Sequence, residues 1–270
     1  MRFRSLRAVV QKHHSRKPFV VLARVAAGYL SSYWNEDMLD MHRNGEARIL
    51  RQCRSYLGPS PVAFDVGSNR GDWTAELLRL IPGSRVHCFE IVPATAAKTA
   101  NRFLGDTRVT SNSIGLSSES GDAIVTVFND SDAVSSIKPL AWNPHTQPVI
   151  CRVAKGDDYL LERHQDHIDI LKCDTEGHDL FVLKGFSGLL SSRPVPIIQF
   201  EYGHQCIPPR VYLADFYEYL RPFGYSIGRL FPEGAKISEY RDIRDEHFRS
   251  GNYIAVHSSY GDLAEAITIP

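Results

Sequence analysis

The stretch that decides the fold reads Phe64-Asp65-Val66-Gly67-Ser68-Asn69-Arg70-Gly71. An apolar run over residues 61–66 predicts a buried strand, and residues 72–80 follow it with a helical pattern. Gly67 lets the chain turn sharply and lets backbone approach a ligand closely, while Gly71 allows tight packing at the helix start. In an open α/β sheet, ligands bind beyond the carboxyl ends of the strands. The stretch therefore predicts a site for a nucleoside-type cofactor.

The glycine spacing separates this loop from two other nucleotide-binding loops. Gly67 and Gly71 form a G-x-x-x-G pattern, whereas a dinucleotide loop reads G-x-G-x-x-G. The middle glycine that a pyrophosphate needs is missing, and the carboxylate of Asp65 would repel a phosphate. No G-K-[ST] follows, which excludes a P-loop. The carboxylate suits an ammonium or sulfonium group, and free N–H groups at the helix start can hold the carboxylate of a methionine moiety.

Residues that suit the rest of a nucleoside follow the next two strands. Glu90 ends the second predicted strand, residues 85–90, and stands 23 positions after Gly67. An acid about 20 residues past the loop accepts hydrogen bonds from ribose hydroxyls. Asn112 and Ser113 end the third predicted strand, residues 108–114, where the adenine edge would lie.

Short apolar runs alternate with helical patterns along the chain, which predicts a parallel sheet with crossover helices. Besides those already named, the predicted strands are residues 168–173, 195–201, 225–230 and 252–257, and the predicted helices are residues 93–104, 157–164, 177–190 and 211–222. We expect a helical N-terminal extension over residues 1–58, the α/β domain over residues 59–260 and a C-terminal tail over residues 261–270.

One region breaks the alternation. Residues 123–128 and 149–153 predict two further strands, the first of them exposed. Between them, residues 129–147 are rich in Ser, Asp, Asn and Pro and predict a long loop, of a length that is often functional. Ser135 and Ser136 in this loop are candidates for substrate or adenine contacts.

The N-terminus is strongly basic. Residues 1–35 contain no Asp or Glu, and their basic residues are Arg2, Arg4, Arg7, Lys12, Arg16, Lys17 and Arg24. The apolar stretch over residues 19–30 is interrupted by Arg24 and is too short to span a bilayer. We expect a basic amphipathic helix packed on the main domain, with a targeting role or a peripheral contact to a membrane or a protein as the alternatives.

Charge and cysteine content exclude other classes. Lys plus Arg and Asp plus Glu each number 31, so there is no basic excess of the kind that nucleic-acid partners require. The five cysteines form no C-x-x-C pair, and Cys88 and Cys173 lie in apolar runs. This pattern predicts free buried thiols in a reducing compartment such as the cytoplasm.

A second polar cluster follows the fourth and fifth parallel strands. These strands run into Leu171-Lys172-Cys173-Asp174-Thr175-Glu176-Gly177-His178-Asp179 and Phe200-Glu201-Tyr202-Gly203-His204. Carboxyl ends of parallel strands meet at one edge of a sheet. We therefore expect five polar side chains to converge beside the cofactor loop: Asp174, Glu176, His178, Glu201 and His204.

With these segments in this order, the sequence resembles the FkbM-type methyltransferases over residues 62–201. The matching segments are residues 65–71, Phe89-Glu90-Ile91-Val92-Pro93, Leu171-Lys172-Cys173-Asp174-Thr175-Glu176-Gly177 and Val182-Leu183-Lys184-Gly185. The third is the most specific, because generic class I methyltransferases lack K-x-D-x-E-G. His178 and Asp179 depart from the family, which commonly has a small residue and Glu there.

The resemblance implies a Rossmann-like class I fold with a mostly parallel, seven-stranded sheet and helices on both faces. It also implies S-adenosylmethionine as cofactor, and usually O-methylation of a sugar or natural-product hydroxyl. The predicted cofactor-binding residues are Asp65, Gly67, Ser68, Asn69, Gly71, Glu90, Asn112, Ser113 and Asp174.

Methyl transfer is an in-line displacement, so the enzyme must align the acceptor and remove its proton. The candidate catalytic residues are Asp174, His178, Glu176 and Glu201. Asp174 and Glu176 also suit a plain structural role, as a helix cap and as a negative charge in the first helical turn. Clustered carboxylates can hold Mg²⁺, but nothing in the spacing requires it and we predict no metal site.

Three functions stay open. The first is an O-methyltransferase acting on a small molecule, a glycan or a lipid-linked sugar. The second is an NAD(P)-dependent oxidoreductase on a similar sheet, against which the loop spacing argues. The third is a non-catalytic partner protein that keeps the fold and the cofactor.

Overall fold

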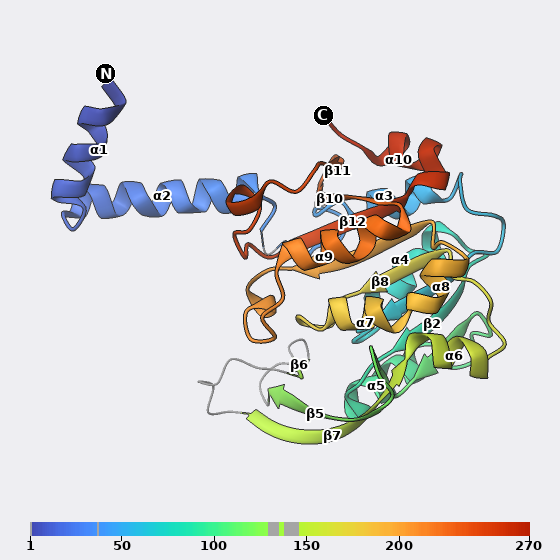
Figure 1. The fold of residues 1–270 in the computed structure, drawn as a ribbon. Coiled ribbons are helices and arrows are strands. Elements are labelled where there is room, and N and C mark those ends of the chain that lie inside the picture. The colour runs from blue at the N-terminus through green and yellow to red at the C-terminus, as the bar shows by residue number, and fades with distance from the viewer. Residues whose placement is uncertain (1, 37, 129–134, 138–145) are drawn as a thin grey trace.

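The computed structural model describes residues 2–36, 38–128, 135–137 and 146–270 (Figure 1). Its centre is an eight-stranded sheet in the order β11-β10-β12-β9-β8-β1-β2-β3. The strands, in that order, are Gly234–Ile237, Tyr225–Phe231, Gly251–His257, Ile197–Tyr202, Ile170–Cys173, Val62–Val66, Arg85–Phe89 and Val109–Asn112. Neighbouring strands from β9 to β3 pair in parallel, whereas β12 runs antiparallel to both β9 and β10. The predicted mostly parallel sheet is therefore confirmed.

The sheet has one strand more than the resemblance implies. β11 pairs with β10 in an antiparallel hairpin, at Leu230↔Ala235 and Phe231↔Gly234. No strand is predicted between residues 230 and 252, because the run Gly234-Ala-Lys-Ile is too short to show a period of its own. The extra strand lies at the sheet edge far from β1.

Helices cover both faces of the sheet, as predicted, because β1 is apolar on both sides. Phe64 belongs to the core beneath α6, α7, α8 and α9, whereas Ala63 belongs to the core beneath α3, α4 and α10. These helices span Gly156–Glu162, Asp179–Gly185, Ser187–Ser192 and Leu213–Leu220, then Glu46–Cys53, Asp72–Leu80 and Gly261–Ile267. The predicted helix over residues 177–190 is thus two short helices, and α5 (Pro93–Arg102) follows β2.

Two helices, α3 in the predicted N-terminal extension and α10 in the predicted C-terminal tail, are part of the α/β domain. α10 lies in the predicted tail, yet Leu263 and Ile267 are buried in the same core as Ile49 and Leu50 of α3. Both helices therefore pack into the core of the α/β domain. Their short lengths hide this role in the sequence.

A second, four-stranded sheet stands beside the main one, in the order β4-β7-β5-β6. Its strands are β4 (Gly115–Ser117), β7 (Thr146–Lys155), β5 (Gly121–Phe128) and β6 (Ser135–Ser136). β5 and β7 contain the two strands predicted on either side of the long loop. Residues 129–134 and 138–145 of that loop lie outside the described residues.

The expectation that the basic N-terminus packs on the domain is wrong. α1 (Arg2–His13) and α2 (Lys17–Tyr33) project away from the domain in Figure 1, and no residue of α2 is buried. Contact with the domain begins at Trp34, whose carbonyl oxygen accepts a hydrogen bond from Arg229 Nε at 2.8 Å. Within the described part of the chain, no helix combines the length and the apolar character needed to cross a membrane.

The strand order reverses between β1 and β8. From β1 the chain proceeds outward through β2 to β3, and from β8 it proceeds in the other direction to β9. The turn after β1 carries Gly67, and the turn after β8 carries Asp174. Such a reversal leaves a crevice at the carboxyl ends of the two strands, where open α/β sheets bind their ligands.

Candidate active site

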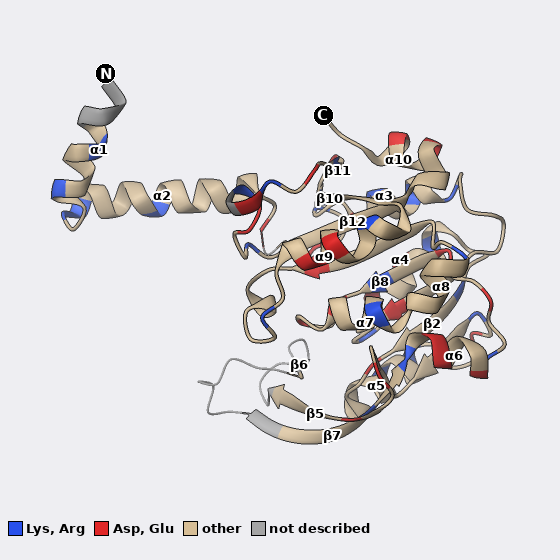
Figure 2. Cartoon of the chain, in the orientation of Figure 1, with Lys and Arg blue, Asp and Glu red and all other residues tan. Residues whose placement is uncertain are grey.

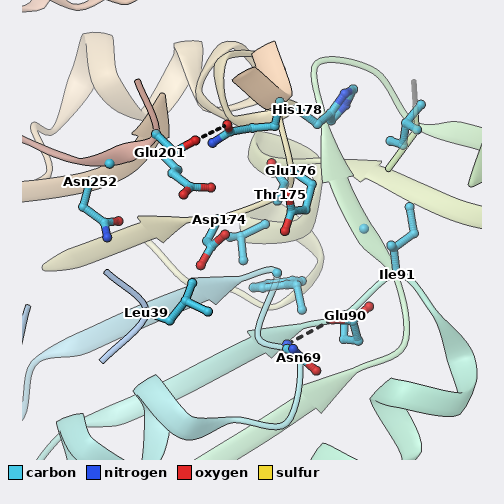
Figure 3. A pocket seen from close by; sticks show the side chains of 18 of the residues that line it. Leu39, Asn69, Glu90, Ile91, Asp174, Thr175, Glu176, His178, Glu201 and Asn252 are labelled. Carbon is cyan, nitrogen blue, oxygen red and sulfur yellow. Dashed lines mark hydrogen bonds between the residues drawn. The ribbon is translucent and has the colours of Figure 1, made fainter. Parts of the chain in front are cut away.

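A cavity of about 410 Å³ opens at this reversal point (Figure 3). Three kinds of segment line it. The ends of β1 and β2 and the turns after them contribute Val66, Gly67, Asn69, Phe89, Glu90 and Ile91. The end of β9 and the turns after β8 and β9 contribute Asp174, Thr175, Glu176, His178, Glu201, His204 and Gln205. The remaining lining residues lie between α2 and the start of α3, in or next to the second sheet, and at the start of β12: Asn35, Met38, Leu39, Asn44, Glu46, Gly115, Leu116, Val125, Ile137, Ser250, Gly251 and Asn252.

The turn after β1 passes directly against the turn after β8. Gly67 has a positive φ of +79°, and a Cβ atom at this position would lie 1.8 Å from the carbonyl oxygen of Asp174. The N–H groups of Gly67 and Ser68 both donate to the carbonyl oxygen of Phe89, each at 2.9 Å. Only glycine permits this close approach between the two turns.

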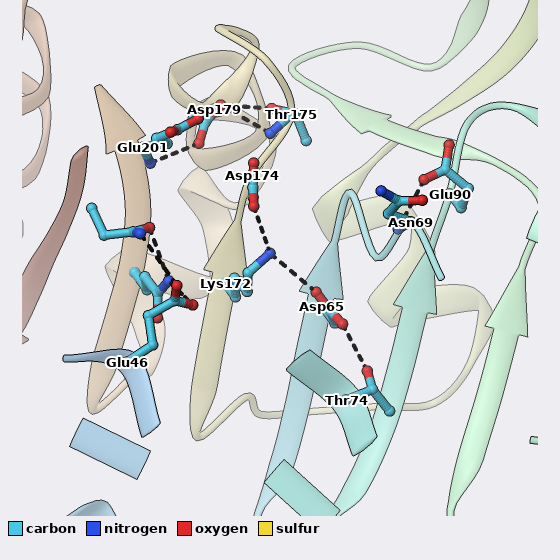
Figure 4. Close-up of polar contacts among 12 residues, drawn as sticks. Glu46, Asp65, Asn69, Thr74, Glu90, Lys172, Asp174, Thr175, Asp179 and Glu201 are labelled. Atoms are coloured by element: carbon cyan, nitrogen blue, oxygen red, sulfur yellow. Dashed lines mark hydrogen bonds and ion pairs between the residues drawn. The ribbon is translucent and has the colours of Figure 1, made fainter. Parts of the chain in front are cut away.

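Glu90 is tied to the backbone of the same loop. Its carboxylate accepts hydrogen bonds from the N–H groups of Asn69 at 3.0 Å and of Val92 at 2.9 Å (Figure 4). Burial raises the pKa of Glu90, and the two backbone donors counteract that rise. The side-chain oxygen of Asn69 is buried and has no hydrogen-bond partner within the described chain. We call Gly67, Asn69 and Glu90 the loop wall of the cavity.

Asp65 lies beneath the loop and does not line the cavity. Its side chain is fully buried, accepts a hydrogen bond from Thr74 Oγ1 at 2.7 Å and stands 3.5 Å from Lys172 Nζ. Lys172 also donates to Asp174 Oδ2 at 3.1 Å, so it bridges the turns after β1 and β8 (Figure 4). Although burial opposes it, the carboxylates of Asp174 and Asp65 raise the pKa of Lys172 and keep this lysine charged.

Three carboxylates, Asp174, Glu176 and Glu201, line the cavity at the ends of β8 and β9, and we call them the acidic wall. Burial, then the charges of Asp174 and Asp179, raise the pKa of Glu176 to about 8. Burial, then the charges of Asp174 and Glu176, raise the pKa of Glu201 well above its usual value. A group of acids that suppress one another's ionisation gains from a cationic ligand.

Asp179 holds the backbone of the acidic wall in place. Its Oδ2 accepts hydrogen bonds from the N–H group and the hydroxyl of Thr175, and its Oδ1 accepts one from the N–H group of Glu201 at 3.0 Å. The side chain is fully buried at the start of α7. It therefore joins the turn after β8 to the end of β9, which keeps Glu176 and Glu201 on one surface.

The two histidines lie at the rim of the acidic wall. His178 Nε2 is 2.9 Å from the hydroxyl of Ser117, and its ring stacks on Phe181 with 4.7 Å between centroids. His204 Nδ1 is 2.7 Å from the hydroxyl of Ser250. Both histidines line the cavity, as the convergence of strand ends predicts.

Other predicted site residues do not line the cavity. Asn112 donates to the carbonyl oxygen of Cys88 at 2.9 Å and accepts from the Tyr159 hydroxyl at 3.2 Å, so its amide is used within the domain. Ser113 is exposed, and Ser68 is buried with a hydroxyl that has no partner within the described chain. Gly71 packs at the helix start, where a Cβ atom would lie 2.5 Å from the Phe103 ring.

Sequence reasoning missed the lining residues before α3 and on β12. Glu46 Oε2 accepts a hydrogen bond from Gln199 at 2.8 Å, and Gln199 also donates to Asn252 at 3.0 Å. Asn35 and Leu39 belong to the link between α2 and α3. No motif marks these positions, because only the folded sheet brings this link beside β9 and β12.

No metal site accompanies these acids in the described residues, where no group of three or more His, Cys, Asp or Glu side chains is arranged to hold an ion. The described cysteines, Cys53, Cys88, Cys151, Cys173 and Cys206, are free and buried.

Comparison with known proteins gives one family match. The family described as "Methyltransferase FkbM domain" matches residues 65–227, which is more than half of the 270-residue chain. No curated protein matches the chain.

Several solved structures are similar to the chain. A methyltransferase FkbM from Methylobacillus flagellatus KT is 18% identical with a TM-score of 0.49, over 74% of this chain and 44% of that one. A precorrin-6y C5,15-methyltransferase from Geobacter metallireducens GS-15 is 13% identical with a TM-score of 0.41, over 78% and 87% of the two chains. A putative O-methyltransferase from Klebsiella pneumoniae is 12% identical with a TM-score of 0.44, over 78% and 79%. The chain thus spans less than half of the M. flagellatus protein.

Proposed function

The chain belongs to the FkbM methyltransferase family, and from that premise we propose that it moves the methyl group of S-adenosylmethionine to a hydroxyl of a sugar, glycan or secondary metabolite. The observation that carries this proposal is the cavity at the reversal point, which sets the loop wall opposite the acidic wall. A nucleoside with a cationic sulfur centre needs both kinds of surface.

The loop wall suits the nucleoside part of this cofactor. Glu90 uses two backbone donors, but a carboxylate has about four lone-pair sites and can also accept from ribose hydroxyls. The buried oxygen of Asn69 has no partner within the described chain, so a ligand donor would satisfy it. Ile91, Leu116 and Val125 give the same cavity an apolar surface suited to a flat base.

The acidic wall suits the charged part and the chemistry. S-adenosylmethionine, when bound, supplies an electrophilic methyl group on a sulfonium. The carboxylates of Asp174, Glu176 and Glu201 would stabilise a cation at that edge, because neighbouring positive charge relieves their mutual repulsion.

We assign Glu176 as the base that takes the acceptor's proton. A general base works best when its pKa lies near the operating pH, and the pKa of Glu176 is raised to about 8. Asp174, fixed by Lys172, would orient the acceptor hydroxyl behind the methyl group, and His178 and Glu201 would border the acceptor. Asp65 takes a positioning role through Lys172 rather than a direct contact.

The test has two steps with the intact chain. Calorimetric titration with S-adenosylmethionine, with NADH as the parallel ligand, should give binding of the first and not of the second. Mass spectrometry across a panel of sugars and hydroxylated metabolites should then find a product heavier by one methyl group. Absence of S-adenosylmethionine binding would refute the methyl-donor assignment, and tight NADH binding would favour an oxidoreductase. Cofactor binding with no methylated product in any fraction would favour the non-catalytic alternative.

A further inference from the structure

The N-terminal arm, α1 and α2, is unlike every other long helix of the protein. α4 buries Trp73, Leu77 and Leu78 against the sheet, whereas no residue of α2 is buried over its 17 residues. Figure 1 shows the arm extending away from the domain. The side chains of α2 are therefore exposed at the surface of the protein.

One face of α2 is apolar. Leu22, Val25, Tyr29 and Tyr33 recur at intervals of three or four residues, so they form a single stripe along the helix. Their exposed fractions are 60%, 64%, 67% and 56%. α1 adds the exposed side chains of Leu6, Val9 and Val10 with the same spacing. Helices of folded domains bury such a stripe, so a contiguous exposed one marks an interaction surface.

The side of α2 away from this stripe carries the two basic side chains of the helix. Lys17 and Arg24 are seven residues apart, so they lie on one side of the helix, opposite the stripe centred on Leu22 and Tyr29. The first 35 residues hold seven Lys or Arg and no Asp or Glu. In Figure 2 the described Lys and Arg positions of α1 and α2 are coloured blue along the arm.

We propose that the N-terminal arm lies on an anionic lipid bilayer. A helix with an apolar stripe on one side and cationic side chains on the other inserts the stripe between lipid headgroups and keeps its charges at their level. Anionic headgroups attract basic segments of this kind. A second copy of the arm is a poor partner, because two arms without any acidic residue would repel each other.

The arm is joined to the cavity by a short link. α2 ends at Tyr33, Trp34 packs on the domain against Phe231, and Asn35 and Leu39 already line the cavity. An arm held on a bilayer would therefore keep the cavity near the membrane surface. This inference is independent of the proposed function, because it rests on the arm alone.

The experiment is co-sedimentation of the full chain with phosphatidylcholine vesicles, with and without phosphatidylglycerol. We expect binding to the mixed vesicles, weaker binding at high salt and little binding to phosphatidylcholine alone. The double variant Val25→Asp, Tyr29→Asp should bind the mixed vesicles at least about tenfold more weakly. Leu161→Asp is the matched control, because Leu161 is 77% exposed on α6 and lies outside the arm.

Three outcomes overturn the inference. The full chain stays in the supernatant with mixed vesicles, or the double variant binds as tightly as the unchanged chain, or Leu161→Asp weakens binding as much as the double variant. Light scattering identifies a second copy as the occupant if the chain is a dimer that the double variant splits and no vesicles bind. Equal thermal midpoints of the two variants and the unchanged chain would establish that the domain stays folded.

Discussion

The two walls of the cavity surround their carboxylates differently. Burial raises the pKa of Glu90 on the loop wall, but two backbone N–H groups donate to this carboxylate and favour its charged form. Glu176 and Glu201 on the acidic wall stand among other acids, and their pKa values are raised by burial and by that neighbouring charge. The same residue type thus stands in two different surroundings, bound to backbone donors on the loop wall and crowded by other acids on the acidic wall.

Forcing the turns after β1 and β8 apart should have the largest effect. Gly67→Ala places a Cβ where only 1.8 Å separates it from the Asp174 carbonyl oxygen, so the two turns must move apart. We expect affinity for S-adenosylmethionine to fall by about 100-fold or more, measured by calorimetry. Gly105→Ala is the matched control, because Gly105 has a positive φ of +86° with no atom near its Cβ position. An equal loss in both variants would contradict a role for contact between the walls.

Removing the ionisable group of the acidic wall should affect transfer rather than binding. For Glu176→Gln we expect the methyl-transfer rate at saturating cofactor to fall about 100-fold, because no base takes the acceptor's proton. Affinity for S-adenosylmethionine should change by less than about tenfold. Glu162→Gln, at an exposed position on α6, controls for the loss of one negative charge. An unchanged rate in Glu176→Gln would remove Glu176 from the chemistry.

The same Glu-to-Gln change on the loop wall should lower cofactor affinity and leave the transfer rate unchanged. Glu90→Gln replaces one acceptor oxygen with an NH₂ group, which then faces the N–H of Asn69 or of Val92. Affinity for S-adenosylmethionine should fall about tenfold, while the transfer rate at saturating cofactor is kept. Kinetics that show a lower maximal rate with unchanged affinity would contradict the division between the walls.

The smallest expected effect is on stability, and it depends on pH. Glu176 has an ordinary pKa of 4.5 when unfolded and about 8 when folded, so between these values the folded chain holds a proton that the unfolded chain has released. Stability therefore falls as pH rises through this window. Glu176→Gln should be more stable than the unchanged chain at pH 8, and the gain should vanish below about pH 4.5. Urea unfolding at both pH values checks this, and a gain independent of pH would contradict it.

Much of the loop wall could be predicted from the sequence. Residues 72–80 are helical at the predicted bounds, and the glycine spacing marks where β1 turns. These signals are local, because a sharp turn needs glycine and a helix shows its period over a few residues. The convergence of Asp174, Glu176 and Glu201 followed from the rule that parallel strand ends share an edge.

The contacts of the other site residues could not be predicted from the sequence and are visible only in the folded chain. The loop pattern predicts Asp65 as a cofactor ligand, but its carboxylate is buried beside Lys172 and Thr74 and does not line the cavity. The end of the third strand predicts Asn112 at the adenine edge, yet the Cys88 carbonyl and the Tyr159 hydroxyl already use its amide. The spacing of residues in the sequence does not show when another group of the domain already binds a predicted ligand residue. The N-terminal arm also differs from its prediction. An amphipathic pattern indicates that one helix face is apolar, but it does not indicate which surface that face contacts.

The most direct measurement of the central claim is proton release on cofactor binding. Calorimetric titration of S-adenosylmethionine at pH 7 in buffers of different ionisation enthalpy counts the protons that leave the complex. A sulfonium beside the acidic wall should lower the raised pKa of Glu176, so the intact chain should release protons and Glu176→Gln should release fewer. Binding without proton release, or equal release by both chains, would contradict the placement of the methyl donor against the acidic wall.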